Sequence, residues 1–99
     1  MGMKLSPEQN ELYRRTDEVL HYIWDPIGVS DSPYARDEYG EYLPQVFGKL
    51  LKNEPSERIV EYLLLIETEN MGLSKNEKNA ERTVEILEEY REKILAKDP

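Results

Sequence analysis

Residues 24–29, Trp-Asp-Pro-Ile-Gly-Val, interrupt a chain in which apolar side chains otherwise recur at helical spacing. A proline disfavours helical backbone in the residue before it, so we expect Asp25 to be extended. Pro26 suits the second position of a tight turn, and Gly28 suits the fourth. This corner, residues 24–29, therefore ends one helix sharply and fixes the direction of the side chains of Trp24 and Asp25.

The first predicted helix covers residues 7–24. Ser6 and Gln9 fit a capping box, and Pro7 fits the first helical position. An apolar stripe at spacings of three and four residues follows, and Pro26 ends it.

The second predicted helix begins after Ser32 and Pro33, and its apolar stripe continues through Pro44. We therefore expect one helix that is kinked near Pro44, because Gly40, four residues earlier, lets the backbone bend. The alternative is a short turn before residue 40 and a helix that begins near Leu43.

The third and fourth predicted helices follow two further start signals. Ser56 caps the third helix, in which residues 59–66 are apolar on nearly all sides. Such a helix is the most enclosed one of its bundle or part of a subunit interface. Gly72 ends this helix, and Ser74 with Glu77 forms a capping box for a last helix whose outer face alternates in charge.

These signals predict an all-α protein. The 99 residues suffice for one modest hydrophobic core, so we expect a single helical domain over residues 1–99. Short connections favour antiparallel neighbours, which predicts a compact antiparallel four-helix bundle with its second helix kinked near Pro44. Residues 25–32 form the longest connection, and loops carry binding residues more often than helix faces do.

The formal net charge of −8 comes mainly from the middle of the chain. Residues 25–70 hold ten acidic and four basic side chains, which gives this segment a net charge of −6. Such a surface repels phosphate groups, which argues against nucleic acid and favours a basic protein partner. The alternative is that the charge only keeps the protein soluble.

Composition also restricts the compartment and the chemistry. The chain has no cysteine, which excludes disulfides, thiolate metal sites and a cysteine nucleophile. The first residues lack the apolar core of a signal peptide, and the longest apolar run, residues 62–66, is too short to cross a bilayer. We therefore expect a cytoplasmic protein without a membrane segment, and no motif indicates a cofactor.

Two pairs of side chains have the spacing of metal ligands on a helix. His21 and Asp25 are four residues apart, as are Asp37 and Glu41. Zinc normally needs three or four ligands, and Pro26 ends the helix near Asp25. A divalent-metal-binding or hydrolytic module that uses these four residues is therefore the alternative hypothesis.

Aromatic and acidic side chains gather around the corner and after it. Aromatic rings with carboxylates nearby are suited to gripping Arg and Lys side chains of another protein. Tyr39 and Tyr42 lie on an apolar stripe and are assigned to the core, whereas for Tyr22, Trp24 and Tyr34 both core and surface remain open. The predicted binding surface comprises eight residues: Tyr22, Trp24, Asp25, Asp31, Tyr34, Asp37, Glu38 and Glu41.

The W-D-P-I-G string at residues 24–28 is followed by D-E-Y at residues 37–39 and by the stripe of Val46 and Leu50. This pattern resembles an uncharacterised family of small bacterial helical proteins that carry a W-D-P-[IL]-G signature. The match covers roughly residues 12–73. The resemblance implies a small all-helical fold in the bacterial cytoplasm, and it implies no activity.

Together these features predict a non-enzymatic, acidic protein-interaction module. An immunity-type inhibitor of a basic toxin is its most concrete form, because a carboxylate-rich face would be steered towards a phosphate-binding cleft. No arrangement of residues indicates a catalytic triad. A homodimer through residues 59–66 is compatible with either hypothesis.

Overall fold

A computed structural model describes residues 4–95, and this part of the chain is helical without a single strand. The elements are, in order, α1 (Pro7–Val19), η1 (Leu20–Trp24), η2 (Pro33–Ala35), α2 (Leu43–Leu51), α3 (Ser56–Leu65), η3 (Ile66–Asn70) and α4 (Glu77–Leu95). The predicted all-α class is confirmed.

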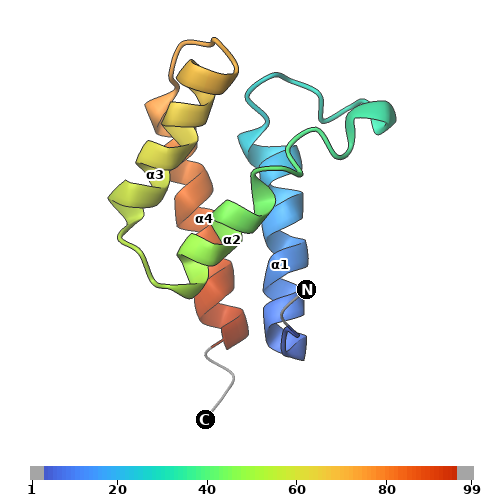
Figure 1. The fold of residues 1–99 in the computed structure, drawn as a ribbon, viewed down its shortest axis with the longest axis vertical. Coiled ribbons are helices and arrows are strands. Elements are labelled where there is room, and N and C mark those ends of the chain that lie inside the picture. Colours follow the sequence, from blue (N-terminus) through green and yellow to red (C-terminus); the bar gives the residue numbers. More distant parts are fainter. Residues whose placement is uncertain (1–3, 96–99) are drawn as a thin grey trace.

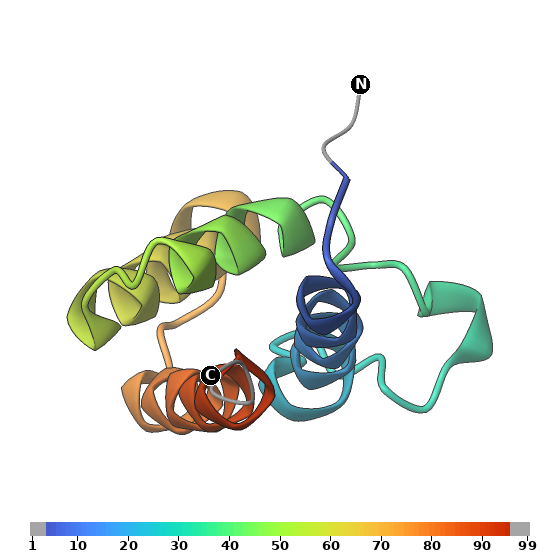
Figure 2. The same ribbon diagram turned by 90° about the horizontal axis from the view of Figure 1, so that it is seen from below.

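The helices lie in two layers. α1 and α4 stand side by side along the longest axis of the molecule (Figure 1). The view from below shows that α2 and α3 form a second layer over them (Figure 2). Residues 30–41, which we call the arm, lead away from the end of η1 and project beside α1 before the chain enters α2.

The first helix begins as the sequence predicts. The amide of Gln9 donates to the Ser6 hydroxyl at 3.1 Å, and the amide of Ser6 donates to the Gln9 side chain at 3.0 Å, which completes the capping box. The α-helix then continues into η1, a π-helical turn in which the amide of Asp25 donates to the carbonyl of Leu20 at 3.1 Å. The helical segment predicted for residues 7–24 is thus confirmed, with a wider last turn.

The prediction of one helix kinked near Pro44 is wrong, and the alternative is right. α2 begins at Leu43, and Pro44 lies in its first turn, where no amide donor is required. The preceding residues form successive turns, in which Gly40 donates to the carbonyl of Asp37 and Tyr42 donates to that of Tyr39. Turns closed three residues apart repeat with nearly the period of a helix, which explains why the apolar stripe continued without a break.

The predicted cap at Ser56 is also wrong. Pro55 precedes the first helical residue, and no side chain among residues 4–95 caps α3. Ser56 is the first residue of α3, and its hydroxyl instead donates to Oε2 of Glu88 in α4 at 2.6 Å. α3 continues into the π-helical turn η3, and Gly72, with a φ of 67°, follows as the predicted helix stop.

α4 starts with a different cap from the one predicted. The amide of Asn79 donates to the side-chain oxygen of Asn76 at 3.2 Å, which is the bond expected of an N-cap. Asn76, rather than Ser74 with Glu77, therefore begins α4.

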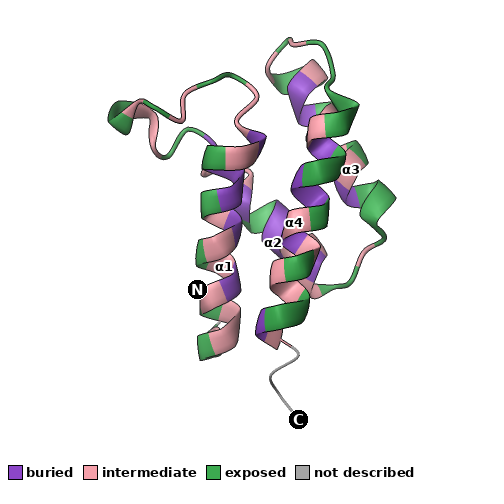
Figure 3. Cartoon of the chain, turned by 180° about the vertical axis from the view of Figure 1, so that it is seen from behind, coloured by how far each residue is buried: buried purple, intermediate pink, exposed green. Residues whose placement is uncertain are grey.

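The core fills the space between the two layers, as the burial colouring shows (Figure 3). Its larger cluster joins all four α-helices and η1, and a smaller cluster of Leu12, Phe47 and Ile94 closes the end where α1 starts and α4 finishes. The larger cluster comprises Val19, Leu20, Trp24, Tyr39, Leu43, Val46, Leu50, Ile59, Leu63, Ile66, Ala80, Val84 and Leu87.

The apolar residues of α3 divide between core and surface. Ile59 and Leu63 are fully buried, whereas Leu65 is 54% exposed. Within residues 4–95, none of the helices combines the length and apolar composition needed to cross a bilayer.

Candidate functional site

The indole of Trp24 is sealed in the core, with 1% of its surface exposed. Its Nε1–H donates to Oε2 of Glu67 at 2.8 Å, and the other carboxylate oxygen of Glu67 accepts from the amide of Asn76 at 2.9 Å. The side chain of Asn79 donates to the carbonyl of Trp24 at 2.8 Å. This ring of hydrogen bonds ties the end of η1 to η3 and to the start of α4.

Glu67 is a buried carboxylate without a cationic partner in the described part of the chain. Two N–H donors replace the water that it loses, and one of them lies at the start of α4, where the helix dipole favours negative charge. The two π-helical turns end the helices beside this contact, so Trp24 and Glu67 meet although they are 43 residues apart.

Asp25 closes the corner on itself. Its φ of 34° and ψ of 59° are left-handed, not the extended backbone that we expected. Asp tolerates this region better than most residues, and its carboxylate accepts from the amides of Val29 at 2.8 Å and Ser30 at 3.1 Å. The turn itself is confirmed, since Gly28 donates to the carbonyl of Asp25 at 3.2 Å and has a φ of 70°.

Tyr39, near the C-terminal end of the arm, adds two further hydrogen bonds to the corner. Its hydroxyl donates to Oδ1 of Asp25 at 2.7 Å and accepts from the amide of Ile27 at 3.2 Å. Burial raises the pKa of Asp25, but the bonds from Tyr39 and from two loop amides outweigh it and hold the pKa below its ordinary value. Burial and the bond to Asp25 raise the pKa of the Tyr39 phenol well above its ordinary value.

These contacts change the roles proposed for Trp24 and Asp25. A side chain buried as completely as Trp24 has no surface for a partner, so the structure assigns it to the core. The carboxylate of Asp25 already accepts three hydrogen bonds, which leaves little of it for an Arg or Lys of another protein. The corner is therefore a structural joint.

The other six predicted binding residues remain on the surface. Tyr34, at the tip of the arm, is 96% exposed, and four of the acids are also exposed: Asp31, Asp37, Glu38 and Glu41. Tyr22 is 57% exposed and lies under the guanidinium of Arg36, at 5.5 Å from the ring centroid. Arg36 also pairs with Asp17 at 3.0 Å, so it fastens the arm to α1.

The residues of the metal hypothesis do not converge. Among residues 4–95, no group of three or more His, Asp or Glu side chains could hold a metal ion. His21 is buried in a T-shaped contact with the Tyr22 ring, and within the described part of the chain its Nδ1 lacks a hydrogen-bond partner. The pair His21–Asp25 is separated by the left-handed turn, which directs the carboxylate of Asp25 into its own loop.

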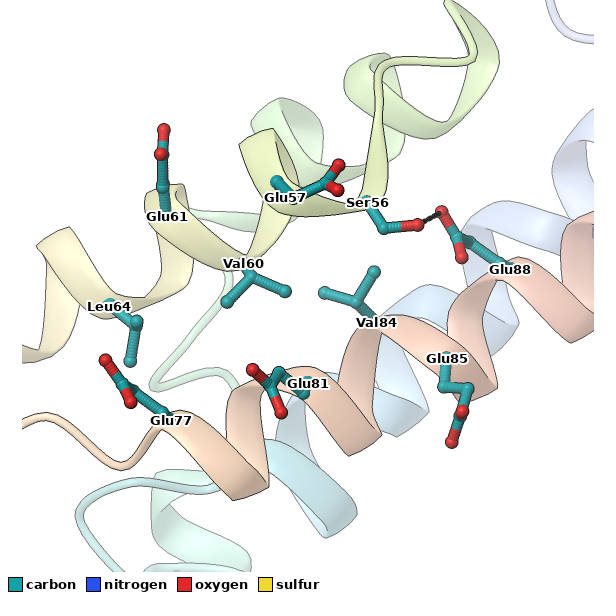
Figure 4. Close-up of a pocket in the computed structure, with 10 residues that line it drawn as sticks. All are labelled: Ser56, Glu57, Val60, Glu61, Leu64, Glu77, Glu81, Val84, Glu85 and Glu88. Carbon is teal, nitrogen blue, oxygen red and sulfur yellow. Dashed lines mark hydrogen bonds between the residues drawn. The ribbon is translucent and has the colours of Figure 1, made fainter.

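A groove of about 450 Å³ lies between α3 and α4 (Figure 4). Val60 and Val84 point toward one another across its floor, and Leu64 extends the floor along α3. The groove is lined by Ser56, Glu57, Val60, Glu61, Leu64, Glu77, Glu81, Val84, Glu85 and Glu88. Six carboxylates thus surround an apolar floor.

The carboxylates occupy both walls of this groove. Glu61 on α3 and Glu85 on α4 point away from the floor on opposite sides, whereas Glu77 extends from α4 toward Leu64 of α3 (Figure 4). Glu88 contacts Arg91 at 4.0 Å, and Glu77 contacts Lys75 at 3.9 Å. The other four, Glu57, Glu61, Glu81 and Glu85, form no ion pair within residues 4–95.

None of the six groove carboxylates was among the predicted binding residues, although Val60, Glu61 and Leu64 lie in the segment 59–66 that was predicted as a possible dimer interface. The last helix was treated as alternating in charge, and its faces were not separated. The row of Glu77, Glu81 and Glu85 at a spacing of four residues was therefore missed. That spacing places three like charges on one face and is a signal that sequence analysis could have used. The matching acids on α3 could be assigned to the same groove only once the two helices were placed together.

Comparison of the chain with protein-family models, with curated proteins and with solved structures gave no match. The resemblance to the W-D-P-[IL]-G family therefore remains a prediction. The same is true of a homodimer through residues 59–66. Ile59, Leu63 and Ile66 are buried, so its surface would consist of five side chains: Val60, Glu61, Tyr62, Leu64 and Leu65.

Proposed function

We propose that this protein is a non-enzymatic interaction module that binds a basic protein partner through the groove between α3 and α4. The observation that carries the proposal is the combination of an apolar floor with four carboxylates that lack ion pairs in the described chain. Apolar contact supplies affinity, and the charges supply orientation and a fast encounter.

The groove is electrostatically unfavourable when it is empty. Glu57 and Glu61 are a like-charged pair at a spacing of four, as are Glu81 and Glu85, and such pairs destabilise a helix by a few tenths of a kcal/mol each. Lys or Arg side chains of a partner would remove this repulsion. They would also cover the partly buried Leu64, which adds a favourable apolar contribution to binding.

An immunity-type inhibitor is the more specific form of the proposal. Such an inhibitor would place its carboxylates over the phosphate-binding cleft of a basic toxin, which the net charge of −8 would attract at long range.

We further interpret α1–α4 as an antiparallel four-helix bundle. The contact between Ser56, at the start of α3, and Glu88, late in α4, supports opposite directions for that pair.

Two variants with equal changes in charge test the proposal. The groove variant carries Glu→Gln at residues 57, 61, 81 and 85, and the arm variant carries Asp31→Asn, Asp37→Asn, Glu38→Gln and Glu41→Gln. Each immobilised protein is incubated with an extract of the organism that encodes it, and the captured proteins are eluted with salt and identified.

The wild type and the arm variant are expected to retain the same basic protein, and the groove variant is expected to lose it. Equal retention by the groove variant would place the contact elsewhere and reject the groove as the binding site. Loss by both variants would show that net charge, rather than the groove, determines capture.

A further inference from the structure

The groove has the shape and chemistry to hold one particular kind of segment. Resting on the proposed function, we infer that the occupant is a single amphipathic helix that places an apolar stripe on the floor and Lys or Arg side chains against both walls. The carboxylates on the two walls and the apolar residues between them carry this inference (Figure 4).

The backbone requirements of an occupant favour a helix. The walls are α-helices, whose backbone groups are bonded within α3 and α4 except for the amides of their first turns, so along most of their length they offer side chains only. An extended peptide on the apolar floor would therefore leave amides and carbonyls without partners, at a considerable cost. A helix satisfies its own backbone and can present one apolar stripe to the floor.

The dimensions agree with a short helix. Glu77 and Glu88 mark the two ends of the wall on α4, which spans about 16 Å at a rise of roughly 1.5 Å per residue. The row of Glu57 and Glu61 on α3 continues to Leu65, an exposed leucine four residues further on. A partner helix of about three turns would cover this length and reach Leu65 with an apolar side chain.

The charge distribution determines the face of the partner. Carboxylates stand on both sides of the floor, so a complementary helix carries basic residues on both flanks of its apolar stripe. The same carboxylates repel a phosphate backbone, which argues against nucleic acid as the occupant. Within residues 4–95 they also do not form a group that could hold a metal ion.

A defined peptide tests the inference. The probe is a fluorescent peptide of about 14 residues, with Leu at helical spacing and Lys on the flanks; this length is marginally helical alone, so folding on binding is measurable by circular dichroism. The first control carries a central proline, which breaks the helix without changing the charge. The second has the same composition with Leu and Lys alternating, which prevents segregation into helical faces.

The parent peptide is expected to gain helicity and to bind about tenfold more tightly than either control, by fluorescence anisotropy. The groove variant is expected to bind it about tenfold or more weakly, because each of four exposed ion pairs contributes up to a few-fold. The arm variant serves as the matched control and should bind normally. Amide NMR shifts of the wild type should change along α3 and α4 and not along the arm.

The possible failures are distinguishable. If the proline or the alternating peptide binds the groove as tightly as the parent, the helical occupant is rejected while the proposed basic partner stands. If none of the peptides binds, or if the groove variant binds them equally well, the proposed function fails as well. Shifts confined to the arm would reject the groove in favour of the surface around Tyr34.

Discussion

The corner and the groove both involve acidic side chains, but these side chains differ in whether groups of the same chain bind them. At the corner, Asp25 accepts three hydrogen bonds, and Glu67, the partner of Trp24, accepts two, all from groups of the same chain. In the groove, Glu57, Glu61, Glu81 and Glu85 remain exposed without ion pairs in the described residues.

This difference separates structural from functional use of charge. A carboxylate whose oxygens are bonded internally holds segments together, and its removal is expected to weaken the fold. Carboxylates that repel one another on the surface contribute nothing to the fold, and their removal should stabilise it. The most distinctive part of the sequence, residues 24–29, belongs to the first kind.

The largest effect is expected from Trp24→Ala. The substitution removes the largest fully buried side chain of the core, and should lower the free energy of unfolding by about 3–5 kcal/mol. Urea unfolding followed by far-UV circular dichroism measures this loss, because the variant lacks the only tryptophan and cannot be followed by tryptophan fluorescence. Tyr34→Ala, at the exposed tip of the arm, is the control and should change stability by less than about 0.5 kcal/mol. Similar small losses in both variants would contradict the structural role of Trp24.

The next effect is expected from Glu67→Leu. It leaves the buried indole N–H of Trp24 without its acceptor and removes the acceptor of the part-buried amide of Asn76, at a cost of about 2 kcal/mol or more in the free energy of unfolding. Glu67→Gln keeps one acceptor oxygen and should lose less. The matched surface change Glu61→Gln should not destabilise the protein. If Glu67→Leu were neutral, the hydrogen-bonded ring around Trp24 would not hold the helices together.

Tyr39→Phe should have a smaller effect that depends on pH. It removes the hydroxyl that bonds Asp25 and Ile27, and should cost about 1–2 kcal/mol near neutral pH. Because the folded pKa of Asp25 lies below its ordinary 3.8, the folded state binds fewer protons there than the unfolded chain. The stability that Asp25 contributes is therefore present above pH 3.8 and is lost as the pH falls through the folded pKa.

At the alkaline end the sign is reversed. The raised pKa of Tyr39 means that the folded state keeps the phenol proton to higher pH than the unfolded chain, so the stability that this group contributes is lost above about pH 10.

Urea titrations between pH 3 and pH 7 test the bond to Asp25. The difference in the free energy of unfolding between wild type and Tyr39→Phe should shrink as Asp25 is protonated. A difference that stays constant across this range would contradict the bond to the carboxylate.

The smallest effect has the opposite sign. The groove variant, Glu→Gln at residues 57, 61, 81 and 85, should be more stable than the wild type by about 0.5–1 kcal/mol at low salt, since it removes like-charged pairs. The gain should shrink as salt screens the repulsion. Thermal unfolding at low and high ionic strength measures both quantities. A loss of stability would show that these carboxylates support the fold and would weaken the contrast with the corner.

Local rules in the sequence predicted most of the helices. The capping box of Ser6 and Gln9, the stop at Gly72 and the turn from Asp25 to Gly28 depend on groups within a few residues of one another, and each is confirmed. Because successive tight turns mimic helical spacing, Pro44 was predicted to kink the middle of a helix, whereas it lies in the first turn of α2. Ser56 was assigned as a cap, but Glu88, 32 residues away, accepts its hydroxyl instead.

The sequence by itself determined the helical class, the acidic charge and the sharp end of the first helix, because these depend on spacing and on backbone preferences of neighbouring residues. Only the tertiary structure decided that Trp24 is buried, since its partner Glu67 lies 43 residues away. It also decided that acids of α3 and α4 share one groove. The sequence shows which residues are charged. Packing determines which of those charged side chains are hydrogen-bonded within the protein and which remain exposed to solvent.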